Sequence, residues 1–289
     1  MLFLHTKLKG YLFIVLSAFS YSLMAVFVKL AGNDLATVQI VFTRGVITLF
    51  LTYIILRKKK VYPLGGNHIV LITRGVIGSV ALYLVYESLH RFSLPEATVI
   101  QYLYPIFTAL FASLLISEKI GGLLYFSITV GLAGVYVILD FPFLVSKTIP
   151  ETNMMIALLG AILTGLSYVM VRKAVTLKES PYVIMFYFPL FTVPMSLFFL
   201  PGNWEMPTMV MWMYLVLVGI TSQLGQLFLT YGYELLPASR AAMTSYIQVP
   251  FSVIAGMIIF NDHITYNFII GTLMILSSIF LIMRKSKTH

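Results

Sequence analysis

Residues 10–30 read GYLFIVLSAFSYSLMAVFVKL, an apolar run in which Lys29 is the single charged residue. A helix rises about 1.5 Å per residue, so a run of about 20 residues can cross the hydrocarbon core of a bilayer, which is about 30 Å thick. Because the run is continuous and does not alternate with polar residues, it predicts a spanning helix and not a strand of a membrane barrel.

Nine further runs of this kind follow, separated by short stretches that contain Lys, Arg, Pro or Asn. Each run has about the length that a membrane-spanning helix needs. The sequence therefore predicts an all-α integral membrane protein with ten transmembrane helices. The predicted spans cover residues 10–30, 37–56, 67–89, 95–116, 120–139, 152–172, 181–200, 208–233, 238–259 and 264–283.

The composition of the 289-residue chain agrees with this class of protein. Hydrophobic residues make up 60% of the chain and charged residues 10%, whereas a soluble domain carries about 25% charged residues. Cysteine is absent, which excludes disulfides, thiol nucleophiles and cysteine metal sites. The five histidines are scattered along the chain, so we expect no metal site and no cofactor.

Basic residues gather in every second loop. Fourteen Lys and Arg residues fall on the side of the two termini and three on the other side, while Arg44 and Arg74 lie within spans. Cytoplasmic loops are the ones enriched in Lys and Arg. We therefore predict a multi-pass protein of the bacterial inner membrane with both termini in the cytoplasm. This topology accounts for the net charge of +9, so we expect no nucleic-acid partner.

The two halves of the chain carry the same pattern at a nearly constant distance. Ser20–Lys29 (SYSLMAVFVK) precedes Thr164–Lys173 (TGLSYVMVRK) by 144 residues, and Pro105 precedes Pro250 by 145 residues. Each proline follows a polar and aromatic stretch and leads to a short polar loop. The pattern indicates an internal duplication.

We predict two repeats of five spans each, in residues 1–145 and residues 146–289. Because each repeat has an odd number of spans, the second repeat enters the membrane inverted relative to the first. Inverted repeats are typical of secondary transporters, in which two similar halves exchange roles as the protein opens to one side and then the other.

Short motifs along both halves identify a family that the chain resembles. The first half contains Tyr21-Ser22, Phe42-Thr43-Arg44, Tyr86-Glu87-Ser88-Leu89, Ala97-Thr98, and Pro105 followed by Glu118. The second half contains Tyr231-Gly232-Tyr233, Ala238–Ala242 and Pro250. In these motifs the chain resembles the EamA-type, ten-helix members of the drug/metabolite transporter superfamily over essentially its whole length. It departs from them at Asn261-Asp262, where many relatives have Gly-Glu.

Two arginines lie within predicted spans, where a charge at mid-bilayer costs about 2.5–3.5 kcal/mol on insertion scales. Arg74 lies about two turns from the cytoplasmic end of its span. It either supplies a counter-charge for an anionic substrate group, such as a carboxylate, or extends to the cytoplasmic headgroups. Arg44 lies about two turns from the outer end of its span, and either extends outward or pairs with Glu87 or Asp34.

Polar side chains recur at helical spacing in four spans, among them Ser79 in the third span. This pattern predicts a shared polar lumen, and a purely structural hydrogen-bond network is the alternative. We expect Pro105 and Pro250 to act as hinges, because proline removes a backbone donor and kinks a helix. The predicted substrate-binding residues are Arg74, Tyr83, Tyr86, Gln101, Tyr104, Tyr168, Gln223, Gln226, Tyr246 and Gln248.

These features favour a secondary carrier that moves a small organic metabolite across the membrane by alternating access. The family resemblance implies amino acids and related compounds first, and S-adenosylmethionine or another nucleoside-like metabolite second. An integral membrane enzyme acting on a lipid-linked substrate is an alternative of another class, as is a channel or a receptor. The partners are then the solute and the lipid bilayer, and a monomer and a homodimer both stay open.

Overall fold

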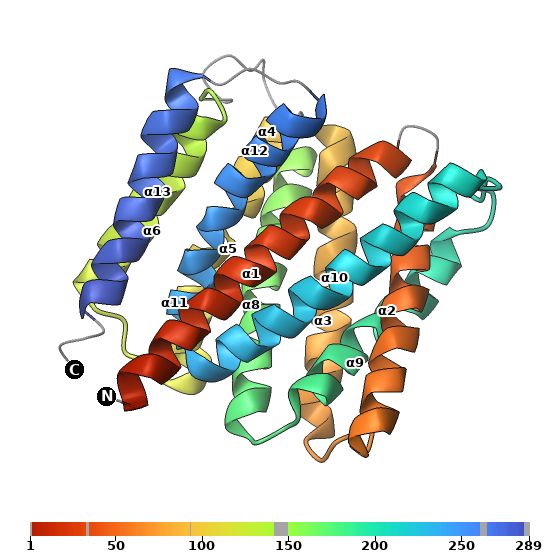
Figure 1. Ribbon diagram of the computed structural model, residues 1–289, viewed down its shortest axis with the longest axis horizontal. Helices are drawn as coiled ribbons and strands as arrows, with labels where there is room; N and C mark the ends of the chain where they lie inside the picture. Colours follow the sequence, from red (N-terminus) through yellow and green to blue (C-terminus); the bar gives the residue numbers. More distant parts are fainter. Residues whose placement is uncertain (1, 33–34, 93, 142–149, 261–264, 286–289) are drawn as a thin grey trace.

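The computed structural model describes residues 2–32, 35–92, 94–141, 150–260 and 265–285. Within these ranges all regular secondary structure is helical, and the helices form one bundle (Figure 1). Nine helical segments of the described chain are long and apolar enough to cross a membrane, and a tenth, with 17 residues, is at the lower limit of that length. The prediction of an all-α membrane protein with ten spans is confirmed.

The helices follow the predicted spans closely. The first half contains α1 (Leu2–Ala31), α2 (Thr37–Lys59), α3 (His68–Arg91), α4 (Leu94–Gln101), α5 (Tyr104–Ile116) and α6 (Gly122–Ile138). The second half contains α8 (Glu151–Thr176), α9 (Pro181–Phe199), α10 (Met209–Leu235), α11 (Ala238–Thr244), the 3-10 helix η1 (Ser245–Ile247), α12 (Gln248–Phe260) and α13 (Tyr266–Lys285).

The fourth and ninth spans are interrupted just before their prolines. The fourth span breaks between α4 and α5, and Pro105 is the second residue of α5. The ninth span passes through η1 before α12, in which Pro250 is the third residue. Proline has no N–H, and its ring clashes with the carbonyl of the preceding turn, which explains a break at this position. A hinge function of the two prolines stays a prediction.

Equivalent helices of the two halves make equivalent packing contacts. α1 packs along α10, and α3 packs along α8. These two pairs are equivalent by the repeat: α8 is the second-half counterpart of α1, and α10 is the second-half counterpart of α3. α2 packs against α9, and α6 against α13, and each of these pairs maps onto itself. In Figure 1, α6 and α13 lie side by side at one edge of the bundle. Such a pattern is what a two-fold relation between inverted halves produces.

Glycines permit the same close approach in both halves. A methyl group on Gly75 of α3 would collide with Phe191 of α9, and a methyl group on Gly219 of α10 would collide with Ile47 of α2. The two contacts are equivalent by the repeat, because Gly219 follows Gly75 by 144 residues and Phe191 follows Ile47 by 144 residues. Small residues let helix backbones approach in a membrane, where packing holds helices together.

Both termini lie at the same end of the bundle (Figure 1). This end is called the N/C face below, and the other end the opposite face. α1, α3 and α9 run from the N/C face to the opposite face, and α2 runs back. The sequence predicts that the N/C face is cytoplasmic, and that orientation stays a prediction.

Candidate functional site

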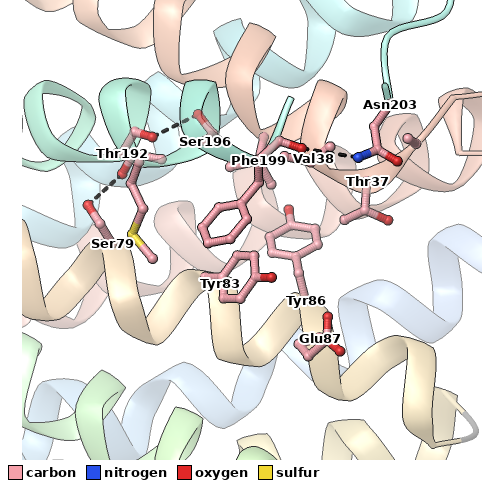
Figure 2. A pocket seen from close by; sticks show the side chains of 13 residues that line it. Thr37, Val38, Ser79, Tyr83, Tyr86, Glu87, Thr192, Ser196, Phe199 and Asn203 are labelled. Atoms are coloured by element: carbon pink, nitrogen blue, oxygen red, sulfur yellow. Dashed lines mark hydrogen bonds between the residues drawn. The ribbon is translucent and has the colours of Figure 1, made fainter. Parts of the chain in front are cut away.

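A cavity of about 340 Å³ lies at the opposite face, between α2, α3 and α9. It is called the α2/α3/α9 cavity. Two predicted substrate-binding residues, Tyr83 and Tyr86 of α3, line it, and Figure 2 shows both facing Phe199 of α9. The rings of Tyr83 and Phe199 are stacked, with centroids 4.8 Å apart. The other lining residues are Ala36, Thr37, Val38, Val41, Ser79, Glu87, Thr192, Met195, Ser196 and Asn203.

Hydroxyl groups form the deep end of this cavity. The Oγ atom of Ser79 lies 2.8 Å from Oγ1 of Thr192, and Oγ of Ser196 donates to the Thr192 carbonyl at 2.7 Å (Figure 2). These hydroxyls join α3 to α9 and are buried. They make the deep end of the cavity polar, whereas its sides are aromatic.

Next to these hydroxyls lies a small chamber of about 10 Å³, a volume suited to one water molecule, and Arg44 is one of the residues that line it. The chamber shares Val41 and Thr192 with the larger cavity. Arg44 is 6% exposed, so it does not extend outward. The predicted pairing of Arg44 with Glu87 is wrong, because Glu87 is 2.6 Å from Arg91 in an ion pair along α3. Asp34, the other predicted partner, lies outside the described residues.

Arg74 lies deeper in the bundle and is 2% exposed. Its guanidinium donates a hydrogen bond of 2.7 Å to Ser167 of α8 and lies 4.7 Å from the centre of the Phe188 ring of α9. No carboxylate pairs with it among the described residues, and its Nε atom has no hydrogen-bond partner there. The side chain passes over Gly78, where any larger residue would collide with it. Arg74 is thus a buried cation and does not reach the headgroups.

A chain of tyrosines fills the centre of the bundle next to Arg74. Adjacent rings in the order Tyr246, Tyr102, Tyr104, Tyr168 and Tyr233 have centroids 5.3–5.8 Å apart, except for the pair of Tyr102 and Tyr104 at 6.1 Å. The chain therefore connects η1, the break of the fourth span, the start of α5, α8 and α10 across both halves. Three of the predicted residues, Tyr104, Tyr168 and Tyr246, belong to it.

Several polar atoms at this centre lack partners. The hydroxyls of Tyr233 and Tyr246, and that of Tyr21 in α1, are buried with no hydrogen bond among the described residues. Tyr21, Tyr168 and Tyr233 are near enough to Arg74 to interact with its charge. A buried polar group without a partner costs about 1–3 kcal/mol, so this arrangement favours a polar ligand or bound water that satisfies several groups together.

The structure does not bring the predicted glutamines together. Gln101 donates to Thr164 of α8 at 3.2 Å. Both side-chain polar atoms of Gln223 bond to Thr52 of α2, at 2.9 and 3.1 Å, which is a helix-to-helix contact. Gln226 is buried on α10, and Gln248 is half-buried at the start of α12.

The N/C face is closed by a carboxylate between the two halves. Oε1 of Glu179, in the turn between α8 and α9, accepts hydrogen bonds from the backbone N of Gly66 and Asn67 at 2.9 and 2.5 Å. The Asn67 side chain adds a third bond of 2.6 Å. Burial raises the pKa of the Glu179 carboxyl, but these hydrogen bonds and the neighbouring His68 outweigh burial and hold the pKa below its usual value. The carboxylate is therefore ionised near neutral pH.

Two further contacts close the same face. Glu118, which follows α5, accepts bonds from the backbone N of Ala238 at 2.9 Å and from the backbone and hydroxyl of Ser239 at the start of α11. Arg172 of α8 donates to the carbonyls of Tyr233 and Glu234 of α10, at 2.8 and 2.7 Å. These hydrogen bonds thus lie at the N/C face, whereas the α2/α3/α9 cavity lies at the opposite face.

Sequence reasoning missed several of these residues. The hydroxyls of Thr192 and Ser196 are four residues apart in α9, a spacing that could have marked them. Glu179 lies in a loop, where a single acidic residue carries no signal of its contacts. Phe199 is one of 22 phenylalanines in an apolar chain, and only its stacking on Tyr83 distinguishes it.

A bundle of ten membrane-crossing helices with exchangeable halves, a cavity at one face and hydrogen-bonded closure at the other defines a membrane transport protein. The chain belongs to the EamA-like transporter family, which it matches over residues 8–140 and again over residues 152–284. The resemblance found in the sequence is thereby confirmed.

Named relatives are transporters of diverse solutes. The pseudopaline exporter CntI of Pseudomonas aeruginosa is 28% identical over 88% of this chain and 88% of its own length. The S-adenosylmethionine uptake transporter of Rickettsia prowazekii is 25% identical over 99% and 96%. Human solute carrier family 35 member G1 is 27% identical over 93% and 77%. The chain is therefore a small-metabolite transporter and not an enzyme.

A solved crystal structure has the same fold. It superposes with a TM-score of 0.80 over 96% of both chains, at 17% sequence identity. At this identity the likeness concerns the arrangement of the helices alone.

Proposed function

We propose that the protein is a secondary carrier of the inner membrane for a small metabolite with a carboxylate group, an amino acid or a related compound. The observation that carries the proposal is Arg74, a buried cation without a carboxylate partner in the described chain, next to tyrosine hydroxyls that also lack partners. A substrate carboxylate would neutralise the guanidinium and accept from the hydroxyls. The tyrosine rings would pack against the remainder of the solute.

The two faces of the bundle support transport by alternating access. Glu179, Glu118 and Arg172 form hydrogen bonds at the N/C face and a cavity lies at the opposite face, which is the arrangement that one of two access states would have. Exchange of the inverted halves would close the cavity and open the N/C face. The interruptions before Pro105 and Pro250 supply flexible points in the fourth and ninth spans.

S-adenosylmethionine is the second candidate substrate. One relative is named as its uptake transporter, and the molecule carries an amino-acid carboxylate that Arg74 could bind. It differs from simple amino acids in its sulfonium charge and its purine ring. Both candidates use the same central cation, so the direct test is a comparison of their fluxes.

The test is flux into proteoliposomes with the variants Arg74→Ala and Arg74→Lys, using radiolabelled amino acids and S-adenosylmethionine as probes. Arg74→Ala should abolish saturable flux. Arg74→Lys should retain part of it, because lysine keeps the charge but loses the two-pronged donor geometry. The matched control is Arg57→Ala, which removes an exposed arginine at the N/C end of α2 and should leave flux unchanged. Unchanged flux and affinity in folded Arg74→Ala protein would show that Arg74 serves packing alone.

A further inference from the structure

The α2/α3/α9 cavity has an aromatic wall. Tyr83 and Phe199 are stacked with an angle of 19° between their planes, and Tyr86 lies beside them (Figure 2). Met195 adds a further apolar and polarisable group. Such a wall packs against an apolar or aromatic side chain, and aromatic faces also attract cations. The volume of about 340 Å³ lies at the lower end of the range for sites that bind one small molecule.

The mouth of the cavity carries a carboxylate with spare bonding capacity. Both hydrogen bonds from Arg91 to Glu87 end on Oε1, at 3.0 and 2.6 Å. No hydrogen bond reaches the second oxygen, Oε2, from the described residues. This oxygen can accept a bond from an ammonium group that enters the cavity.

The buried cation of Arg44 lies near the deep end of the cavity. The guanidinium of Arg44 has neither a hydrogen bond nor an ion pair among the described residues, although the residue is 6% exposed. Arg44 lines the chamber that shares Val41 and Thr192 with the cavity. Its charge also reaches Tyr21 and Tyr168 at the centre of the bundle. A buried cation at this depth is costly, so an anionic group that approaches Arg44 from the cavity would be bound favourably.

We propose that the α2/α3/α9 cavity is a second solute-binding site, which takes a zwitterion with an apolar or aromatic side chain. The ammonium group faces Glu87 and the aromatic rings, the side chain packs against Tyr83 and Phe199, and the carboxylate points toward Arg44. This inference rests on the proposed carrier function and adds a binding site apart from Arg74.

Phe188 lies next to both arginines. It lines the chamber of Arg44, and the guanidinium of Arg74 lies 4.7 Å from its ring centre on α9. Both arginines are also near enough to Tyr21 and Tyr168 to interact with them electrostatically.

The test uses protection of a single cysteine. The chain contains no cysteine, so Met195→Cys places the only thiol in the cavity wall, where a small methanethiosulfonate reagent can modify it in purified protein. The probes are L-phenylalanine, its methyl ester, which lacks the carboxylate, and N-acetyl-L-phenylalanine, which lacks the ammonium group. L-Phenylalanine should slow modification, and each derivative should need at least tenfold higher concentration for the same effect.

Variants assign the two charges separately. Arg44→Gln should raise the half-protecting concentration of L-phenylalanine at least tenfold and leave that of the methyl ester unchanged. Glu87→Gln, at the accessible rim, should weaken protection by L-phenylalanine and by the methyl ester but not by the N-acetyl compound. It also keeps the proposal testable should Arg44→Gln fail to fold. The matched control, Arg57→Gln, should change none of these values.

Equal protection by all three probes, or protection unaffected by both Arg44→Gln and Glu87→Gln, would overturn the second site. Arg74→Gln separates this inference from the proposed function, because it should abolish flux while leaving protection of Met195→Cys intact. Loss of protection in Arg74→Gln as complete as in Arg44→Gln would mean that there is one site only. Flux that depends on Arg74 without any protection would refute the cavity site alone. Protection that depends on Arg44 without any flux would support the cavity site and refute the carrier function.

Discussion

Replacement of Glu179 by glutamine should open the N/C face. The variant keeps the shape and the acceptor oxygen of the side chain, but the three hydrogen bonds from Gly66 and Asn67 lose the charge of their acceptor. A bond to a charged group contributes about 1.5–3 kcal/mol and a neutral bond about 0.5–1.5 kcal/mol. Since one oxygen accepts all three bonds, we expect the closed state to lose about 1–3 kcal/mol, which raises the population open at this face about 5- to 150-fold.

A buried thiol beneath Glu179 reports this opening. Val183 of α9 is 1% exposed, and a methyl group on Gly65 would lie 3.0 Å from its Cγ1 atom, so Val183 is covered by the loop that Glu179 holds. Val183→Cys is nearly isosteric and introduces the only thiol of the chain. The rate of maleimide modification in inside-out vesicles should rise in Glu179→Gln by a factor in the expected range.

The matched control is Glu151→Gln in the same background, which neutralises an exposed acid at the other end of α8 and should leave the rate unchanged. The pH dependence gives a second check. A carboxyl with a depressed folded-state pKa stabilises the closed state at pH values above its unfolded pKa, about 4.3. That stabilisation is lost only as the pH falls through the lower folded-state value. The thiolate is the form that reacts with maleimide, so both rates rise with pH, but the ratio of the rate in Glu179→Gln to that in the Val183→Cys parent should be constant between pH 6 and 8. An unchanged rate in folded Glu179→Gln protein would refute the role of Glu179 in closing this face.

Three other predictions concern orientation, the centre and packing. For orientation, an impermeant maleimide should label Glu151→Cys in intact cells. It should label Thr176→Cys, at the other end of the same helix, only after permeabilisation. The reverse pattern would invert the topology. For the centre, Tyr246→Phe should leave thermal stability unchanged or slightly raised, because the hydroxyl has no partner, but should weaken solute binding; unchanged affinity would remove Tyr246 from the site. For packing, Gly219→Ala should destabilise the protein by about 1–3 kcal/mol through collision with α2. The control Gly121→Ala has nothing near its Cβ position and should not change the stability. Equal melting temperatures of the two variants would contradict this account.

The repeat pattern in the sequence predicted much of the fold. The distance of about 144 residues between matching segments reappears in the glycine contacts of α3 with α9 and of α10 with α2. Pro105 and Pro250 marked the two interrupted spans, although each interruption lies just before its proline and not at it. These features could be predicted because they depend on local properties of the chain, namely apolar length and the missing N–H of proline.

The candidate site was predictable only in part. A stripe at helical spacing shows which side chains share a face of one helix, but not which neighbouring helix that face meets. Tyr83 and Tyr86 therefore lie in a cavity with residues of α9, while Gln223, on an equally polar stripe, bonds to Thr52 and takes no part in that cavity. Arg44 has no ion pair in the described chain, because its predicted partner Glu87 pairs with Arg91 one turn away.

The sequence by itself determined the class of the protein, the number of spans and the duplication, because hydrocarbon admits only long apolar helices whose backbone groups bond within the helix. Only the tertiary structure decided that Arg74 is buried beside a chain of tyrosines, that the cavity lies between α2, α3 and α9, and that Glu179 closes the N/C face. Each of these depends on contacts between residues that are far apart in the sequence, such as the hydrogen bond of Arg74 with Ser167, 93 positions away. Such contacts arise from the angles and offsets at which helices pack, and no local property of the chain specifies them.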